Sequence, residues 1–257
     1  MDLGLKDRVA MVIGASRGLG KAIASTLAGE GCNLAICARG EGPLLETAAE
    51  LEEKNIDVLA AALDVTESDT ADRFVAQTVE KFGRIDILIN NVGGNRRKPF
   101  AETTDADWDE ILDLNFGSHV RFSRAAIPEL KKRGGAILFV SSVFGREAGG
   151  PGLSIYNTTK SALISLSKIM AQELGPEGIR VNSIAPGSIR FPGGSWDRRC
   201  KEDPEGMARF AEENFAIRRF GTAEEIGDVA AFLVSERASL ITGACLNVDG
   251  GQSRSLI

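Results

Sequence analysis

The sequence is poor in the residues that build metal centres and disulfide frameworks. It contains one histidine and four cysteines among 257 residues. Cys32 and Cys37 lie in a strand-like run, an odd number of residues apart, so they face opposite sides of that strand. With one histidine and no C-x-x-C pair, we predict no metal site. Scattered free thiols are typical of a reducing compartment.

Long hydrophobic runs and an excess of basic charge are also missing. The longest early apolar run, Val9–Ile13, has the length of a strand, and the first residues show no signal-peptide pattern. Acidic residues outnumber basic ones by 36 to 30, which gives a formal net charge of −6. Such a charge repels nucleic acid and anionic membranes. We therefore expect a cytoplasmic protein with neither of these partners.

What the sequence does have is a regular alternation of short apolar runs and longer helical patterns. Seven strands are predicted, at Val9–Ile13, Asn33–Cys37, Asp57–Leu63, Ile85–Asn90, Ala136–Ser141, Arg180–Ile184 and Cys245–Val248. Six helices are predicted, at Gly18–Gly29, Pro43–Lys54, Ser68–Phe82, Asp105–Lys132, Ser154–Leu174 and Ala223–Val234. Near-continuous apolar strands separated by helices indicate a parallel sheet covered on both faces. The prediction is one α/β domain over residues 1–257, a Rossmann-type doubly wound sheet.

The segment from Phe191 to Asn214 breaks this alternation. It holds Gly193, Gly194, Pro204 and a mixed cluster of charges. A stretch of this kind is typical of a long functional loop. We predict a mobile substrate lid at about residues 190–215, leaving from the end of the sixth strand.

A glycine-rich turn follows the first strand. Its sequence is Gly14-Ala15-Ser16-Arg17-Gly18-Leu19-Gly20, and a helix begins within it. Glycines at such a turn let the backbone approach a pyrophosphate, and the helix start presents free N–H groups. A glycine turn can also be purely steric, but its place after an N-terminal strand favours a dinucleotide site.

The end of the second strand bears on which coenzyme is bound. An acidic residue there would bind the ribose of NAD, but this strand ends in Arg39, and Arg17 lies in the glycine turn. Two guanidinium groups suit the 2′-phosphate of NADP(H), so we predict NADP(H) over NAD(H). The alternative is that both are ordinary solvated arginines. After the third strand, Asp64 is either an acceptor for the adenine amino group or a structural turn aspartate.

The only tyrosine of the chain, Tyr156, stands four residues before Lys160 in a predicted helix. This spacing places both side chains on one helical face. An ammonium near a phenol favours the phenolate and lowers the tyrosine pKa, which suits proton transfer. Ser142 falls just beyond the fifth strand, at the sheet edge where ligands bind, and either polarises a substrate oxygen or caps the turn.

Taken together and in order, these motifs resemble the short-chain dehydrogenase/reductase family, in the form of 3-oxoacyl-[acyl-carrier-protein] reductases. The resemblance covers essentially the whole chain. It rests on Gly14-x-x-x-Gly18-x-Gly20, Asp64-Val65, Asn90-Asn91-Val92-Gly93, Asn115, Ser142, Tyr156-x-x-x-Lys160, Pro186-Gly187 and Val248-Asp249-Gly250-Gly251. The coenzyme-binding residues it implies are Gly14, Ser16, Arg17, Gly18, Leu19, Gly20, Arg39, Asp64, Val65, Asn91, Gly93, Tyr156, Lys160, Pro186, Gly187 and Ile189.

The resemblance implies a catalytic tetrad and an assembly. Tyr156 is expected to be the general acid/base, Ser142 to orient the carbonyl, and Lys160 to bind the nicotinamide ribose. Asn115 is expected to hold a water that links Lys160 to solvent. The substrate is a small carbonyl compound or alcohol. A homotetramer is expected, through the helices at 105–132 and 154–174 and the tail from residue 248.

Three departures from the family pattern stand out. Val92 replaces a usual alanine, and one extra residue separates Ser142 from Tyr156. Phe191 stands where relatives commonly have a threonine that holds the nicotinamide carboxamide. The family's side-chain contact to the carboxamide does not carry over to Phe191, and Arg190 and Phe191 are candidates to shape the substrate pocket instead.

Several alternatives remain open on the sequence. His119 is interpreted as a packed or interface residue, and the run Arg96-Arg97-Lys98 as a solvated face or an attractor of anions. A dinucleotide-binding regulator without turnover is the runner-up function, although all four polar positions of the tetrad are kept. Among enzymes, reduction of a carrier-bound 3-oxoacyl group competes with reduction of small ketones, sugars or polycyclic alcohols. Pro176-Glu177-Gly178, where carrier reductases tend to be basic, weighs against the carrier.

Overall fold

Seven short apolar segments form the strands of one parallel sheet in the computed structural model, which describes residues 2–256. Their order across the sheet is β3-β2-β1-β4-β5-β6-β9. The strands are β1 Val9–Ile13, β2 Asn33–Ala38, β3 Val58–Ala62, β4 Ile87–Asn90, β5 Gly135–Val140, β6 Ile179–Pro186 and β9 Cys245–Val248. The chain reverses its direction of winding between β1 and β4, as in a doubly wound fold.

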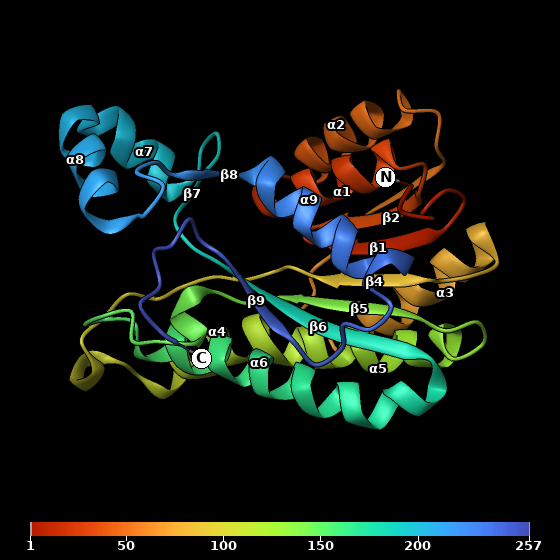
Figure 1. Ribbon diagram of the computed structural model, residues 1–257. Coiled ribbons are helices and arrows are strands. Elements are labelled where there is room, and N and C mark those ends of the chain that lie inside the picture. Colours follow the sequence, from red (N-terminus) through yellow and green to blue (C-terminus); the bar gives the residue numbers. More distant parts are fainter. Residues whose placement is uncertain (1, 257) are drawn as a thin grey trace.

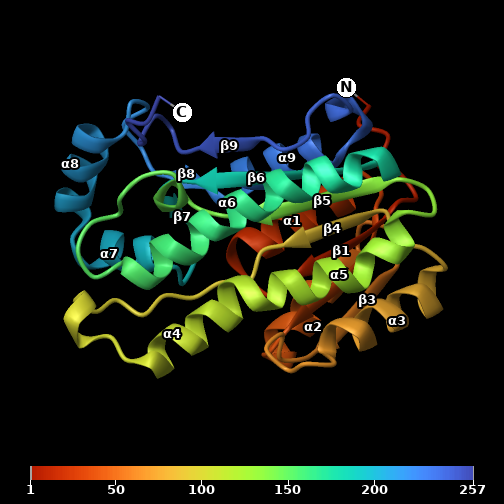
Figure 2. The same cartoon turned by 90° about the horizontal axis from the view of Figure 1, so that it is seen from below.

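Helices cover both faces of this sheet (Figure 1). One face carries α1 Gly18–Gly29, α2 Glu41–Glu52 and α9 Ala223–Val234. The other carries α3 Thr70–Phe82, α5 Ser118–Leu130 and α6 Ser154–Leu174, which Figure 2 shows lying over the sheet and running roughly along its strands. Each face has its own apolar core. Cys32 is buried in one core and Cys37 in the other, which confirms that they face opposite sides.

The predicted fold class is confirmed, and the observed ends of the predicted strands and helices lie within two residues of the predicted ones. Short 3₁₀ turns add detail at Phe100–Glu102, Val143–Gly145, Gly175–Glu177 and Glu236–Ala238. Within residues 2–256, no helix is both long and apolar enough to cross a membrane.

The predicted single helix over residues 105–132 is wrong in one respect. It is divided into α4 Asp105–Leu112 and α5 by a π-helical turn, Asp113–Gly117. Arg121 on α5 pairs with Asp113 across this turn, at 2.7 Å. A π turn widens the helix by one residue and is common at functional sites. Here it contains Asn115, a predicted site residue.

The predicted long loop after β6 is largely helical, which corrects the sequence interpretation. It forms α7 Ser195–Glu202 and α8 Pro204–Asn214. A two-stranded sheet, β7 Ile189–Arg190 paired with β8 Gly221–Thr222, connects these helices to the main body. Figure 1 shows α7 and α8 projecting from the sheet beyond this neck. We refer to residues 191–220 as the lid segment.

Candidate active site

The predicted site residues gather at the carboxyl edge of the sheet, where four neighbouring strands end. The glycine turn follows β1, Asn91 follows β4, Ser142 follows β5, and Gly187 follows β6. In open α/β sheets the ligand crevice lies at this edge, where the winding reverses.

In the glycine turn, the backbone at Gly20 packs so closely against the backbone at Gly14 that side chains would prevent the contact. Gly14 has a φ of +85° and Gly18 a φ of +58°, which favour glycine. A side-chain carbon on Gly20 would lie 2.1 Å from the Gly14 carbonyl oxygen. Helix α1 begins at Gly18 with no capping side chain and no acidic residue in its first turn. Its N–H groups thus present positive potential without an internal carboxylate, which fits a diphosphate.

Three side chains fix the turn after β4 against its surroundings. Asn91 donates from Nδ2 to the Gly14 carbonyl at 2.9 Å, which ties this turn to the glycine turn. Asn115 bonds both the N–H and the carbonyl of Gly94, at 2.7 and 2.9 Å. His119 is fully buried, and its Nε2 lies 2.9 Å from the Val92 carbonyl.

His119 is neutral and therefore a positioning group rather than a proton carrier. Burial, with Lys160 nearby, lowers its pKa to about 3. Because a carbonyl oxygen only accepts, Nε2 carries the proton in this contact. The interpretation of His119 as a packed residue is confirmed.

The arginines expected at the adenosine end are exposed. Among the described residues, neither the Arg17 nor the Arg39 side chain makes a hydrogen bond or an ion pair within the chain. Asp64 accepts from the backbone N–H and hydroxyl of Thr66, at 2.9 and 2.7 Å, so it does stabilise a turn. These hydrogen bonds, with Arg39 as a minor contributor, lower the pKa of Asp64.

Tyr156 and Ser142 meet at the end of β5. The Ser142 hydroxyl accepts from the Phe144 N–H at 3.2 Å and forms a hydrogen bond with the Tyr156 hydroxyl. The Ser142 hydroxyl also carries its own hydrogen, which it can donate to the tyrosine oxygen. Lys160 lies one helical turn further on, buried, with its Nζ 5.9 Å from the centre of the Tyr156 ring.

The expected lowering of the tyrosine pKa towards neutrality is not found. Burial raises the pKa of Tyr156, and the Ser142 hydrogen bond offsets this only in part. Lys160 donates to the Val140 carbonyl at 2.9 Å rather than to the phenol. Burial also lowers the pKa of Lys160 to about 8. Desolvation disfavours the charged form of each group, so it opposes the phenolate and the ammonium alike.

Two residues of this cluster were missed by sequence reasoning. Thr159 receives a hydrogen bond from Asn115 at 3.0 Å and donates to the Tyr156 carbonyl at 2.9 Å, so it connects the π turn to α6. A side-chain carbon on Gly145 would lie 2.7 Å from the Lys160 carbonyl oxygen. Neither residue type is unusual in a helix or a turn, so the sequence carried no signal for either.

The segment after β6 is held by the carboxyl-terminal tail. A side-chain carbon on Gly187 would lie 2.7 Å from Gln252 Oε1, and the same oxygen accepts from the Ser188 N–H at 2.8 Å. Ile189 is buried, on the neck strand β7. Gln252 is a further residue that the motifs did not indicate.

The basic run after β4 is largely neutralised by α4. Arg96 pairs with Glu110 at 2.7 Å, and Lys98 pairs with Asp107 at 2.8 Å. This arrangement favours the solvated-face interpretation over attraction of an anion.

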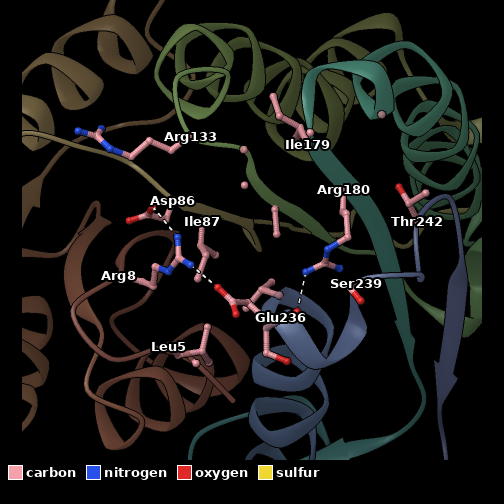
Figure 3. Close-up of a pocket in the computed structure, with 18 residues that line it drawn as sticks. Leu5, Arg8, Asp86, Ile87, Arg133, Ile179, Arg180, Glu236, Ser239 and Thr242 are labelled. Carbon is pink, nitrogen blue, oxygen red and sulfur yellow. Dashed lines mark hydrogen bonds and ion pairs between the residues drawn. The ribbon is translucent and has the colours of Figure 1, made fainter. Parts of the chain in front are cut away.

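A cavity of about 620 Å³ lies at the opposite, amino edge of the sheet (Figure 3). Figure 3 shows Arg8 between Asp86 and Glu236, and it pairs with both. Arg180 donates to the carbonyls of Leu233 and Ser235, at 2.7 and 2.9 Å. These cations are thus satisfied by the protein itself, and the cavity is remote from the glycine turn and Tyr156.

Comparison with known proteins gives extensive matches. The family model described as enoyl-(acyl carrier protein) reductase matches residues 14–253. The chain is 34% identical to dehydrogenase/reductase SDR family member 4 of Sus scrofa, over 98% of this chain and 89% of that protein.

Two solved structures are similar over almost the full length. One is L-sorbose reductase from Gluconobacter frateurii complexed with NADPH and L-sorbose, with a TM-score of 0.94 and 36% identity, covering 100% of both chains. The other is 7α-hydroxysteroid dehydrogenase complexed with NADH and 7-oxo glycochenodeoxycholic acid, with a TM-score of 0.90 and 30% identity. It covers 100% of this chain and 98% of that one.

Proposed function

This chain belongs to the short-chain dehydrogenase/reductase family of oxidoreductases, and from that premise we propose that it transfers a hydride between NADP(H) and a small carbonyl compound or secondary alcohol. The observation that carries the proposal is the meeting of Tyr156 and Ser142 at the sheet edge beside the glycine turn. A proton donor next to a dinucleotide site is the arrangement that carbonyl reduction requires.

The residues present fit a dinucleotide. The close approach at Gly14 and Gly20 leaves backbone N–H groups at the start of α1 for the diphosphate. The Arg17 and Arg39 side chains, which are exposed and make no hydrogen bond or ion pair among the described residues, would bind the 2′-phosphate of NADP(H). L-sorbose reductase, which was solved with NADPH, supports this choice, whereas the hydroxysteroid dehydrogenase was solved with NADH.

Bound NADPH would supply the hydride for the carbonyl carbon. In this proposal Tyr156 holds the proton and delivers it from its hydroxyl to the carbonyl oxygen. Its raised pKa keeps the hydroxyl protonated near neutral pH, which suits reduction. Ser142 bonds the same substrate oxygen, so that the carbonyl lies between two hydroxyl groups.

Lys160 and Asn115 complete the proposed tetrad. Lys160 would bind the nicotinamide ribose hydroxyls and exchange its contact with the Val140 carbonyl for them. Asn115 forms hydrogen bonds with Gly94 and Thr159. It thereby supports the turn after β4 and, through Thr159, the backbone of Tyr156 on α6.

The substrate class favoured here is a small polar ketone or sugar rather than a carrier-bound acyl group. Glu177, where a basic residue would suit an acidic carrier protein, pairs with Lys131 at 3.1 Å. The likeness to L-sorbose reductase over the whole chain supports a ketose. The family model's description keeps the acyl-carrier alternative as the second candidate. Retention of all four tetrad residues argues against a regulator without turnover.

The experiment is a coenzyme-oxidation assay with NADPH and with NADH. The panel holds L-sorbose and other ketoses, small and steroid ketones, and a 3-oxoacyl thioester. We expect NADPH to be consumed with a ketose. Consumption only with the thioester would support the second candidate. NADPH binding without oxidation across the panel would support the regulator instead.

A further inference from the structure

Phe191 occupies the junction between the neck and the lid segment. It follows β7 directly and is partly buried against the core on the α1 and α9 side of the sheet. Side-chain carbons placed on Gly18 and on Gly194 would lie 2.8 and 2.9 Å from Cε2 of its ring. One ring therefore packs on both glycines at the same time.

The two glycines belong to different binding regions. Gly18 is the first residue of α1, where the diphosphate is proposed to bind. Gly194 is the N-cap of α7 in the lid segment. Because neither glycine has a side chain, the ring approaches both backbones closely. Close packing then transmits a displacement of one glycine backbone through the ring to the other.

The helices beyond Phe191 form one packed unit. Trp196 on α7 stacks on Phe210 of α8, with ring centres 5.4 Å apart, and lies 5.2 Å from Phe220. Asp197, which is 6% exposed, accepts from the Gly193 N–H at 3.2 Å and from Arg190 at 3.2 Å. A shift at Phe191 is therefore transmitted to α7 and α8 together.

The unit begins and ends near residues with a left-handed backbone. Gly193 has a φ of +72°, and Arg218 on the return to β8 has a φ of +54°. A non-glycine residue in the left-handed region is uncommon and marks a position fixed by its surroundings. The unit is thus bounded on both sides by left-handed turns.

We propose that Phe191 couples the coenzyme site to the substrate lid, so that coenzyme and substrate bind cooperatively. This inference rests on the proposed binding of a dinucleotide at the glycine turn. When a diphosphate binds at the start of α1, it changes the packing of the ring on Gly18. The ring then moves the first residues of α7. Because coupling is reciprocal, substrate strengthens coenzyme binding by the same factor.

The test uses Trp196 as a reporter of the lid. The chain has two tryptophans, so W108F leaves Trp196 alone. NADP⁺ is titrated into W108F and into W108F/F191A and W108F/F191L, with binding measured by calorimetry and Trp196 emission recorded in parallel. The oxidised coenzyme is chosen because it does not absorb tryptophan emission. Circular dichroism confirms that each variant is folded.

We expect NADP⁺ to change Trp196 emission in W108F, to leave it unchanged in F191A, and to give an intermediate change in F191L. Dissociation constants for NADP⁺ should stay within about threefold across the variants. A ketone found to be a substrate in the assay, which cannot react with NADP⁺, should tighten NADP⁺ binding about tenfold in W108F and not in W108F/F191A. If NADP⁺ binds to W108F without changing Trp196 emission, or if it changes the emission equally in W108F and W108F/F191A, the coupling is overturned. The proposed function is not affected by either result. Absence of any NADP⁺ binding contradicts the proposed function and the coupling with it.

Discussion

At the scale of single residues, burial decides the protonation states in the candidate site. It raises the pKa of Tyr156 and lowers that of Lys160 to about 8, so both groups are pushed towards their neutral forms. The Ser142 hydrogen bond opposes this at the tyrosine because it stabilises the phenolate. The site therefore holds a protonated phenol in neutral solution, ready to donate.

A pH dependence follows from the raised pKa of Tyr156. Reduction needs the protonated phenol, so its rate should be level through neutral pH and fall only on the alkaline side. Alcohol oxidation needs the phenolate, so its rate should rise with pH on the alkaline side, where the rate of reduction falls. Tyr156 is the only tyrosine, so the ultraviolet absorbance of tyrosinate reports its titration directly. A tyrosinate signal already complete at neutral pH would contradict the assignment.

The coenzyme preference is tested at Arg39. R39Q should weaken NADPH binding about ten- to a hundredfold, because a charge-assisted contact to a phosphate contributes roughly 1.5–3 kcal/mol. NADH binding should change little. R73Q is a matched control, since Arg73 is an exposed cation on α3 that pairs with Glu67 and Asp69. Equal effects of R39Q on both coenzymes would show that Arg39 does not contact the 2′-phosphate.

Residues with a rare type or a fixed spacing could be found from the sequence. The lone tyrosine and the glycine turn are of this kind. Thr159, Gly145 and Gln252 could not, because their importance lies in contacts between segments far apart in the chain.

At the scale of elements, the lid segment differs most from the sequence-based expectation. Glycines and mixed charges suggested a loop, yet the charges are spaced to support helices. Lys201 pairs with Asp197 one turn earlier, at 2.7 Å, and Asp203 caps α8 through the Gly206 N–H at 2.9 Å, with Pro204 as its first residue. The π turn at Asp113–Gly117 carries no comparable signal, because an amphipathic pattern does not reveal one inserted residue.

The role of the lid segment in substrate binding can be tested through Asp197. D197N removes the charge that pairs with Arg190 and Lys201 and should loosen α7 from the neck. We expect KM for the substrate to rise by about three- to tenfold, with kcat less affected and coenzyme affinity within about twofold. E205Q is the control, because Glu205 is an exposed lid carboxylate 3.9 Å from Arg209. If D197N instead dissociates the oligomer with KM unchanged, the segment is an assembly element.

At the scale of the whole molecule, the doubly wound fold class was within reach of the sequence. Seven apolar runs separated by helices admit few right-handed arrangements, and the glycine turn after the first strand selects the doubly wound one. The structure describes a single chain and therefore does not test the assembly, so the tetramer remains a prediction.

Exposed apolar side chains support that prediction. Ile169 on α6 is 49% exposed, Leu246 on the edge strand β9 is 42% exposed, and Leu240 is 96% exposed. Ile169 lies on, and Leu246 next to, an element that the family resemblance assigns to subunit contacts, and closed symmetry would bury both. Light scattering at micromolar concentration should give a tetrameric mass, and L246K should reduce it. A monomeric mass would refute the assembly.

The most direct test of the proposed chemistry is Tyr156→Phe. The ring fills the same space while the titrating hydroxyl disappears, so the variant should fold and bind NADPH within about threefold of the unchanged protein. Turnover with the best substrate should fall about 10²–10⁴-fold, the usual contribution of general acid–base catalysis. Turnover near that of the unchanged protein, with the same coenzyme affinity, would contradict Tyr156 as the proton donor and the site as the reaction centre.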